Sequence, residues 1–446
     1  VSRKNYKNWL KRVRRRVRKD WVHKSYLIME LNFKIRDKSD KSLKLREENL
    51  ENFKKKGFPN KREEDWKFTD LEKFLKDNFD ELNNDNLNDK KPDFQEFSFI
   101  HNSIKLVNGK LQSFDFKPEN LKDKNYFSIS KLDFNHHLNF ANNLKDNPMQ
   151  NLNTALHEGG FNLNISSDYK FKHPIVIYNY FTGTLKNKII NNSDSINLLK
   201  NSNATILEYL VDESKGNFFK NTFKYINLDE NSHLDYYFIN KNESSNFFYE
   251  FSKVQLSKNT NFKKYLFSSG IKFGKFESDI KLNGTNSCGE VYSGLFLDNN
   301  NHQEVKTTIQ HLKPNCQSHQ DVKNVITSGS KGVFQGKIFV KEIAQKTNAY
   351  QLSKGLLLDK DSEFSTKPEL EIYADDVKCS HGSTSGNIDK DALFYLKARG
   401  IDSKEAVKMI IKGFLETVLE KIKNKEIMDI LLNHFNTHIK YENRSN

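Results

Sequence analysis

Cys379 and His381 belong to the densest group of chemically capable side chains in the sequence, Tyr373-Ala-Asp-Asp-Val-Lys-Cys-Ser-His-Gly382. A thiol and an imidazole two residues apart lie on the same face of an extended strand, here beside Asp375 and Asp376. Cysteine, histidine and carboxylate are ligand types suited to iron or zinc. The alternative is a buried cysteine and a hydrogen-bonded histidine with a structural role. The residues alone leave both interpretations open and favour the structural one.

Three other motifs are weaker. The segment 329–338 has six residues between its outer glycines and Ile338 where a phosphate-binding loop needs Ser or Thr, so we reject an ATP site. Gly382-Ser-Thr-Ser-Gly386 has threonine where a nucleophilic serine is required. Cys316 and His319 are two soft ligands without a second pair, which favours a buried structural role over a metal site.

The elements that must position these residues are short strands. From 96 to 385 the chain alternates apolar residues with Asn, Ser, Gly and Asp. A nine-residue unit, with apolar first, third and ninth positions and a small polar seventh, begins at Ile196, Ile226, Val254, Ile280 and Leu356. The near-constant spacing predicts a mainly β fold in which short coils stack as a solenoid. Chance recurrence in another all-β protein is the alternative.

Helical patterns flank the strands. We expect an N-terminal helical domain over 29–95, with a capping box at Thr69 to Glu72 and a linker over 80–93. After the 96–385 core, a C-terminal helical domain over 386–446 begins with a helix from Asp389 to Gly400. A second helix starts at Asp402, and a third carries Ile427 and Phe435. These helices cap the solenoid or supply an interaction surface.

Charge is concentrated at one end of the chain. Of the net +14 of the 446 residues, residues 1–28 carry eleven Lys or Arg against one Asp, which leaves +4 for the rest. We expect 1–28 to be a basic extension outside the fold, with a functional basic tail or a transit peptide as alternatives. A nucleic-acid role would rest on this segment alone, so we expect none. The absence of an 18-residue apolar run excludes a membrane-spanning helix, and three scattered cysteines indicate a reducing compartment.

Longer motifs resemble one known family. Thr366–Gly386, Phe394–Gly400 and Ala406–Ile411 are similar to the SufB/SufD family of iron-sulfur cluster assembly scaffolds and, within it, to the SufD branch. Gly57–Thr69 resembles the N-terminal signature of that branch, and His311–Cys316 resembles a segment of its β-helix. The resemblance covers about residues 40 to 422. It departs from the family at 1–28, which has no counterpart, and at Ser383–Ser385, where the family commonly has Ala and Val.

The resemblance implies a right-handed parallel β-helix between helical domains and a place in the cytoplasmic SUF complex. The implied partners are a SufB paralogue, paired through the β-helix and supplying sulfur, and a SufC ATPase docked on the C-terminal helices, with a homodimer as a further state. We expect Phe394, Arg399, Met409 and Phe414 to take part in that docking. ATP binding by SufC would twist these helices and open the interface between the two scaffold chains.

His381 corresponds to the family histidine that faces a SufB cysteine where the nascent cluster forms. The resemblance therefore implies that His381 binds iron of a transient iron-sulfur cluster shared with SufB, and that a reduced flavin accompanies the complex. Cys379 shares the motif, but packing is its favoured role over ligation. The chain itself would be a scaffold without enzymatic activity. A purely structural subunit is the alternative. We reject a polysaccharide lyase because no arginine occurs between Arg62 and Arg399.

Overall fold

The computed structural model describes residues 29–36, 40–85, 92–117, 126–132 and 147–438, so the predicted basic extension 1–28 lies outside the described residues. The N-terminal part contains helices and short strands. Their bounds are β1 (Glu30–Asn32), α2 (Asp40–Lys56), the 3-10 turn η1 (Glu64–Trp66), α3 (Leu71–Asn78), β2 (Glu81–Asn83), β3 (Asn102–Val107), β4 (Lys110–Asp115), β5 (Phe127–Lys131), α5 (Pro148–Leu156) and β6 (Phe161–Ile165).

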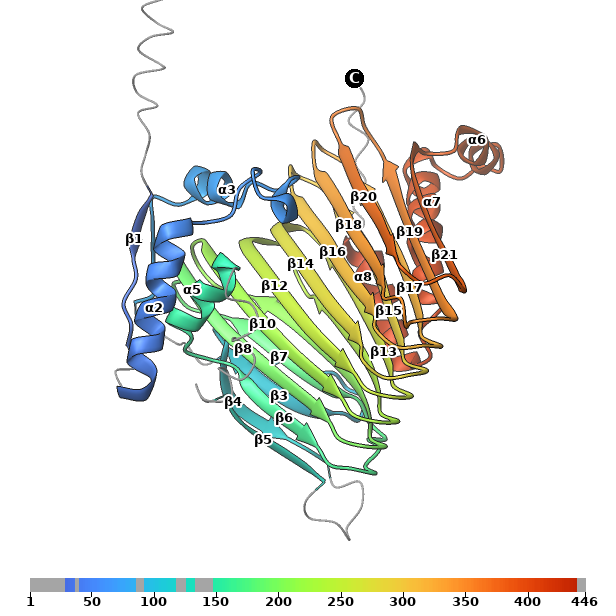
Figure 1. The fold of residues 1–446 in the computed structure, drawn as a ribbon. Helices are drawn as coiled ribbons and strands as arrows, with labels where there is room; N and C mark the ends of the chain where they lie inside the picture. Colours follow the sequence, from blue (N-terminus) through green and yellow to red (C-terminus); the bar gives the residue numbers. More distant parts are fainter. Residues whose placement is uncertain (1–28, 37–39, 86–91, 118–125, 133–146, 439–446) are drawn as a thin grey trace, which may run out of the picture.

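The predicted solenoid is confirmed. Successive strands alternate between two mainly parallel sheets, which form a flattened parallel β-helix (Figure 1). The strands are β7 (Ile175–Phe181), β8 (Lys188–Leu198), β9 (Asn203–Asp212), β10 (Phe218–Leu228), β11 (His233–Asn240), β12 (Ser244–Leu256), β13 (Asn261–Ser269), β14 (Ile271–Leu282), β15 (Cys288–Leu297), β16 (His302–His311), β17 (Gln317–Ile326), β18 (Lys331–Val340), β19 (Thr347–Leu357), β20 (Glu363–Ile372) and β21 (Val377–Asn387). From β8 onward, even-numbered strands form sheet A and odd-numbered strands form sheet B.

The repeat works because equivalent residues stack. Ile196, Ile226, Val254 and Ile280 are register partners in sheet A, and their side chains share the apolar interior between the sheets. The copy predicted at Leu356 is wrong, because Leu356 pairs with Val325 in sheet B. The column in sheet A continues instead through Ile309, Ile338 and Leu370. The unit missed Ile309 because His311 stands at its apolar third position, and Leu370 because Lys378 stands at its apolar ninth position. It missed Ile338 because the turn that follows is longer.

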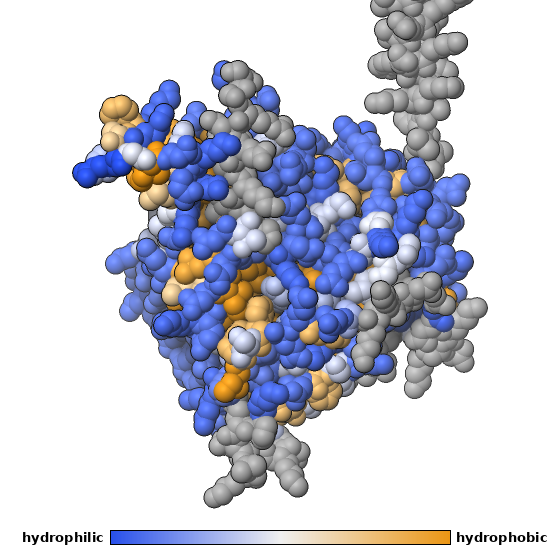
Figure 2. All heavy atoms as spheres, turned by 180° about the vertical axis from the view of Figure 1, so that it is seen from behind, coloured by the Kyte–Doolittle hydropathy of each residue, from blue (hydrophilic) through white to orange (hydrophobic). Residues whose placement is uncertain are grey.

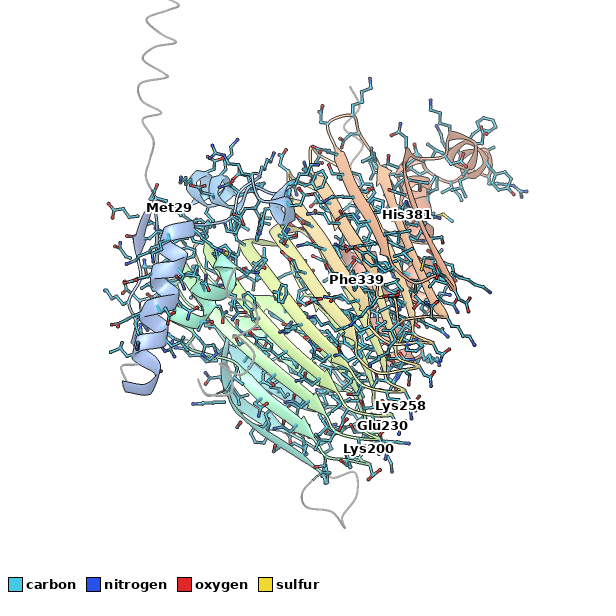
Figure 3. All side chains as sticks on the ribbon, viewed as in Figure 1. Met29, Lys200, Glu230, Lys258, Phe339 and His381 are labelled. Carbon is cyan, nitrogen blue, oxygen red and sulfur yellow. The ribbon has the colours of Figure 1, made fainter. Side chains whose placement is uncertain are left out.

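From β8 to β17, each corner from sheet A to sheet B is turned by an asparagine, whereas Lys346 takes the same left-handed conformation between β18 and β19. Asn201, Asn231, Asn259 and Asn286 all have φ between 55° and 60°, a left-handed conformation that asparagine tolerates better than most residues. Their amides form a ladder in which Asn231 donates to Asn201 at 2.9 Å and Asn259 donates to Asn231 at 2.9 Å. Beside this ladder, Glu230 pairs with Lys200 and Lys258, which lie in the corners of the preceding and the following coil (Figure 3).

N-terminal elements cover the outer face of sheet A (Figure 1). Trp66 lies under the ammonium of Lys275, 4.3 Å from the ring centre to Nζ, and Asp65 pairs with Lys306 at 2.7 Å. Glu64 pairs with Lys367 on β20, so η1 reaches from β14 to β20. The N-terminal region differs from prediction in two ways. The expected linker 80–93 contains β2, and Asp70 rather than Thr69 caps α3, because the Thr69 hydroxyl bonds Glu304.

Three helices follow the last strand, as predicted. They are α6 (Lys390–Ala398), α7 (Ser403–Leu419) and α8 (Lys425–His438). Asp389 and Asp402 cap the first two through bonds to backbone amides, and Gly400 adopts the positive φ that ends α6. The apolar faces of α7 and α8 pack on the outer face of sheet B, whereas α6 projects from the body and buries no residue (Figure 1).

Candidate functional site

His381 lies on β21, the last strand of sheet B, and its side chain is exposed. Strands β20 and β21 form the terminal coil of the solenoid, and among the described residues each is paired on one side only. Their outer edges therefore present backbone donors and acceptors that another strand can use. Figure 3 shows His381 at this end of the molecule, far from the helices around Met29.

Cys379 shares the strand face of His381 but has a different environment. Its side chain is partly buried against a small cluster that includes Ile338, Ala349 and Ala374. Burial raises the pKa of the thiol, opposed by a backbone hydrogen bond at Ala349. An uncharged, packed thiol is a poor metal ligand at neutral pH. Packing therefore stays the predicted role of Cys379.

The carboxylates near this pair do not complete a metal site. Asp375 and Asp376 lie in the turn before β21, where the backbone of Asp376 bonds to Lys346 and Gln345. Within the described part of the chain, no group of three or more His, Cys, Asp or Glu side chains is placed to hold a metal ion. A metal ion bound at His381 would therefore need ligands beyond those that the described residues bring together.

The weaker motifs have structural roles. Cys316 is fully buried at a corner of the solenoid, where its thiol donates to the carbonyl of Gly284 at 3.2 Å. His319 faces the opposite side of sheet B and contacts the ring of Tyr292. The two are therefore not a ligand pair. The glycines of 329–338 belong to a turn and to strand β18, and Gly382–Gly386 lies within β21.

The four predicted docking residues occupy two environments. Phe394 on α6 is 74% exposed and Met409 on α7 is 44% exposed. Arg399 ends α6, with its guanidinium 5.2 Å from the ring of Tyr395, which is itself 57% exposed. Phe414 is partly buried, and the ammonium of Lys323 lies 5.2 Å from its ring. The most accessible apolar surface of these helices is thus on α6.

Two surface hollows lie on the outer faces of the two sheets. One, of about 510 Å³, lies between η1 and sheet A and is lined by five carboxylates and Lys306. The other, of about 570 Å³, lies between residues 97–99 and α8 and is lined by Glu426, Asp429 and Lys241 among others. Apolar side chains are exposed over part of the face that Figure 2 shows. Carboxylates outnumber lysines in the lining of each hollow, whereas a flavin pyrophosphate is bound by basic side chains or clustered backbone donors. The flavin stays a prediction for the complex.

A buried charge cluster in the interior was not predicted. Lys224 pairs with Glu208 and Glu250, and Lys264 bonds Glu250 at 2.9 Å. Burial raises the pKa of the nearby Asp194 to about 7, against the attraction of Lys224 and Lys220. Burial also disfavours charge on Glu250, but Lys224 and Lys264 hold its pKa well below the usual range. The sequence signal is charged residues at the inward positions of β8, β9, β10, β12 and β13, where apolar residues are the rule.

Comparison with known proteins identifies two related regions. Residues 181–414, just over half of the chain, match the family model described as "SUF system FeS cluster assembly, SufBD core domain". Residues 25–99 match the model described as "SufBD protein N-terminal region". The first match covers the strands from the end of β7 through His381 to α7, and the second covers the N-terminal elements on sheet A.

Individual relatives agree with these matches. The chain is 31% identical over 237 residues to the iron-sulfur cluster assembly protein SufD of Escherichia coli, which covers 53% of this chain and 56% of the relative. It is 30% identical over 228 residues to the chloroplastic protein ABCI7 of Arabidopsis thaliana, covering 51% and 48% of the two chains. The matches thus span about half the length of these relatives. No helix in the described ranges combines the length and apolar character needed to cross a bilayer.

Proposed function

The chain belongs to the SufBD family of iron-sulfur cluster assembly proteins and is SufD-like, and we propose that it is one half of a scaffold on which a cluster is built. In this proposal its terminal coil pairs with a SufB-type partner, and His381 binds iron of the nascent cluster together with ligands of that partner. The cluster is cargo that passes on, and the sulfur arrives through the partner.

The observation that carries the proposal is the position of His381 on an open strand edge. An exposed imidazole is a good iron ligand when it is neutral, but one ligand cannot hold a cluster. The unpaired edges of β20 and β21 offer a docking surface for strands of a second chain. A partner that extends both sheets would bring its own side chains to His381 and complete the ligand set.

The position of α6 supports a mechanical role for an ATPase partner. Only Ile388 and Asp389 separate the end of β21 from α6. A SufC-type ATPase that binds the exposed Phe394 and Tyr395 could therefore move β21 through this short link. The stacked coils behind β21 form a rigid support, so displacement of α6 would act on the terminal coil and on the interface at His381.

The test is to co-express the chain with SufB-type and SufC-type partners and to purify the complex without oxygen. Iron and acid-labile sulfide are measured for the native chain and for His381→Ala. The matched control is His233→Ala, because His233 is also a partly exposed histidine of sheet B but lies on β11, away from the terminal coil. We expect cluster content to fall at least tenfold in His381→Ala and to stay unchanged in the control.

Assembly is measured on the same samples by light scattering. Complex formation by both variants, together with cluster loss in His381→Ala alone, would support the ligand role. Unchanged cluster content in His381→Ala would mean that the chain is a purely structural subunit. Failure of the native chain to form a complex would reject the proposed partners.

A further inference from the structure

Seven buried polar atoms on one side of the solenoid have no hydrogen-bond partner among the described residues. They belong to Ser268, Ser293, Gln303, Gln320, Asn324 and Gln351, of which Asn324 contributes both its amide oxygen and its amide nitrogen. All six residues are at most 2% exposed. An unpaired polar atom in a dry interior loses its hydrogen bonds to water without replacement and so destabilises the fold, and this concentration of such atoms needs an explanation.

The six side chains share one compartment. Ser293 lies between Val291 and Leu295 on alternate positions of β15, and both of these neighbours pack in the interior between the sheets. Gln320 is the register partner of Val291, and Asn324 is the register partner of Leu295. Gln303 shares its strand face with Val305 and Ile309, which are also interior residues. The unpaired atoms therefore gather between the sheets in the coils from β13 to β19.

Rotation of the amide groups does not remove the problem. The oxygen of Gln320 accepts from Thr307, which leaves its nitrogen free. The nitrogen of Gln351 donates to the carbonyl of Gly336 at 3.3 Å, which leaves its oxygen free. After an exchange at Gln320 its nitrogen would donate to the Thr307 hydroxyl, and its oxygen would be left unpaired instead. An exchange at Gln351 would break the bond to Gly336 and leave both amide atoms unpaired. Ordered water, which accepts and donates at once, satisfies both kinds of atom.

At its β13 end, this compartment adjoins the buried charge cluster described above. Lys264, which pairs with Glu250, also donates to Ser278 at 3.2 Å. Ser278 and Thr307 are register partners in sheet A, one strand spacing apart, about 4.8 Å. Thr307 then bonds Gln320 across the interior. Polar groups therefore continue without an apolar interruption from the charges at β10 and β12 to β17.

The compartment ends at the terminal coil. Gln320 and Gln351 are register partners, and Gln351 is in turn the register partner of His381. Ser353 donates to Ser383 at 3.0 Å in the adjacent column. The side chains of His381 and Ser383 are exposed, so the last members of this polar series contact solvent at the open end of the solenoid.

We propose that the interior of these coils binds a file of ordered water molecules that carries protons between solvent at the terminal coil and the buried Asp194–Lys224 cluster. If each water meets two or three of the seven atoms, roughly three waters complete the set. In each hop one O–H bond breaks as another forms, so a proton that reaches Asp194 is replaced from solvent at the other end. The proposal concerns the chain itself and needs neither iron nor a partner.

The first experiment counts internal waters in the purified chain by magnetic relaxation dispersion of the water oxygen signal. The test variant is Gln320→Leu with Gln351→Leu, which removes both half-bonded amides. The control is Gln317→Leu, on the same strand β17 but with an exposed side chain. We expect the number of long-lived waters to fall by about two in the test variant and to stay constant in the control.

The second experiment follows proton uptake at Asp194 by time-resolved infrared spectroscopy after a pH jump, with Asp194→Asn used to assign the carboxyl band. We expect uptake to slow at least tenfold in the glutamine double variant. A water count unchanged by that variant, or equal uptake rates, would overturn the proposal. If the double variant does not fold, Ser293→Ala, which keeps the backbone and nearly the same volume, must still lose a water for the proposal to stand.

Discussion

His381 and Gln351 are register partners on neighbouring strands of sheet B, so an exposed imidazole lies one strand spacing from an amide that is only 2% exposed. Side-chain exposure thus changes from solvent-exposed to buried between two adjacent strands. This follows from ending a solenoid on an uncovered coil, because inward-facing positions of the last strand have no following coil to bury them. A residue there is held by the rigid sheet and remains accessible to another molecule.

Replacing Lys275 will destabilise the fold far more than replacing Lys258. Both lysines pair with glutamates, but Lys275 and Glu304 are fully buried, whereas Lys258 lies at an exposed corner. Lys275→Ala leaves the Glu304 charge unpaired and removes the contact with Trp66, so we expect a loss of about 3 kcal/mol in unfolding free energy. Lys258→Ala should cost less than about 1 kcal/mol. Urea denaturation measures both, and equal losses would contradict the assigned burial.

Stability will fall as the pH drops below neutral, and His302 will account for part of the fall. Burial lowers the pKa of His302 to about 4. The unfolded chain, with an ordinary histidine pKa near 6.5, therefore binds the proton first, and the contribution of His302 is lost between about pH 6.5 and 4.

Between pH 7.5 and 5 this loss amounts to about 2 kcal/mol for His302 alone. Urea denaturation at the two pH values should show a difference that is smaller by that amount in His302→Gln. The same pH dependence in the variant and the native chain would mean that His302 is not buried in its neutral form. Other buried histidines, such as His311, remain in both proteins and contribute equally.

Replacing Phe394 should weaken binding of the ATPase partner proposed above without weakening the fold. The ring is 74% exposed on a helix that buries no residue, so Phe394→Ser should change unfolding free energy by less than about 0.5 kcal/mol. An aromatic anchor at an interface contributes about 2 kcal/mol, which is roughly a thirtyfold change in affinity. Titration calorimetry with the SufC-type partner measures it. Phe114→Ser, at a 48% exposed phenylalanine on β4, is the control and should leave affinity unchanged.

The asparagine corners can be dissected with one pair of variants. Asn231 has φ 60°, and its amide nitrogen and oxygen bond Asn201 and Asn259 in the corners on either side. Asn231→Gly keeps the backbone freedom and loses only the bonds, whereas Asn231→Ala also carries the strain of a left-handed residue with a β-carbon. We expect the alanine variant to be less stable than the glycine variant by about 1 kcal/mol. A more stable alanine variant would contradict the left-handed corner.

The solenoid was predictable because its signal repeats. The apolar pairs that begin at Ile196, Ile226, Val254 and Ile280 all precede the corner from sheet A to sheet B. Their spacing along the sequence is set by the length of one coil. The failure at Leu356 has a physical cause. The turn from sheet B back to sheet A also follows apolar residues and ends in a serine, so a local pattern does not distinguish the two corners.

The site was predictable only in part. The spacing of Cys379 and His381 correctly places both on one strand face, but exposure depends on which coil is last, and the sequence does not mark the end of stacking. The buried charges were missed for a different reason. Lys224 and Glu250 come from separate coils, and their pairing requires the register of β10 with β12, which no local pattern contains.

The η1 segment makes contacts whose complete set depends on the number of coils in the solenoid. Trp66, Asp65 and Glu64 contact Lys275, Lys306 and Lys367, which lie on β14, β16 and β20. A duplicated coil of about 29 residues inserted after β16 would preserve every stacking contact but move Lys367 one strand spacing, about 4.8 Å, away from Glu64. The complete set of η1 contacts therefore requires a fixed number of coils between the N-terminal elements and the coil that carries His381.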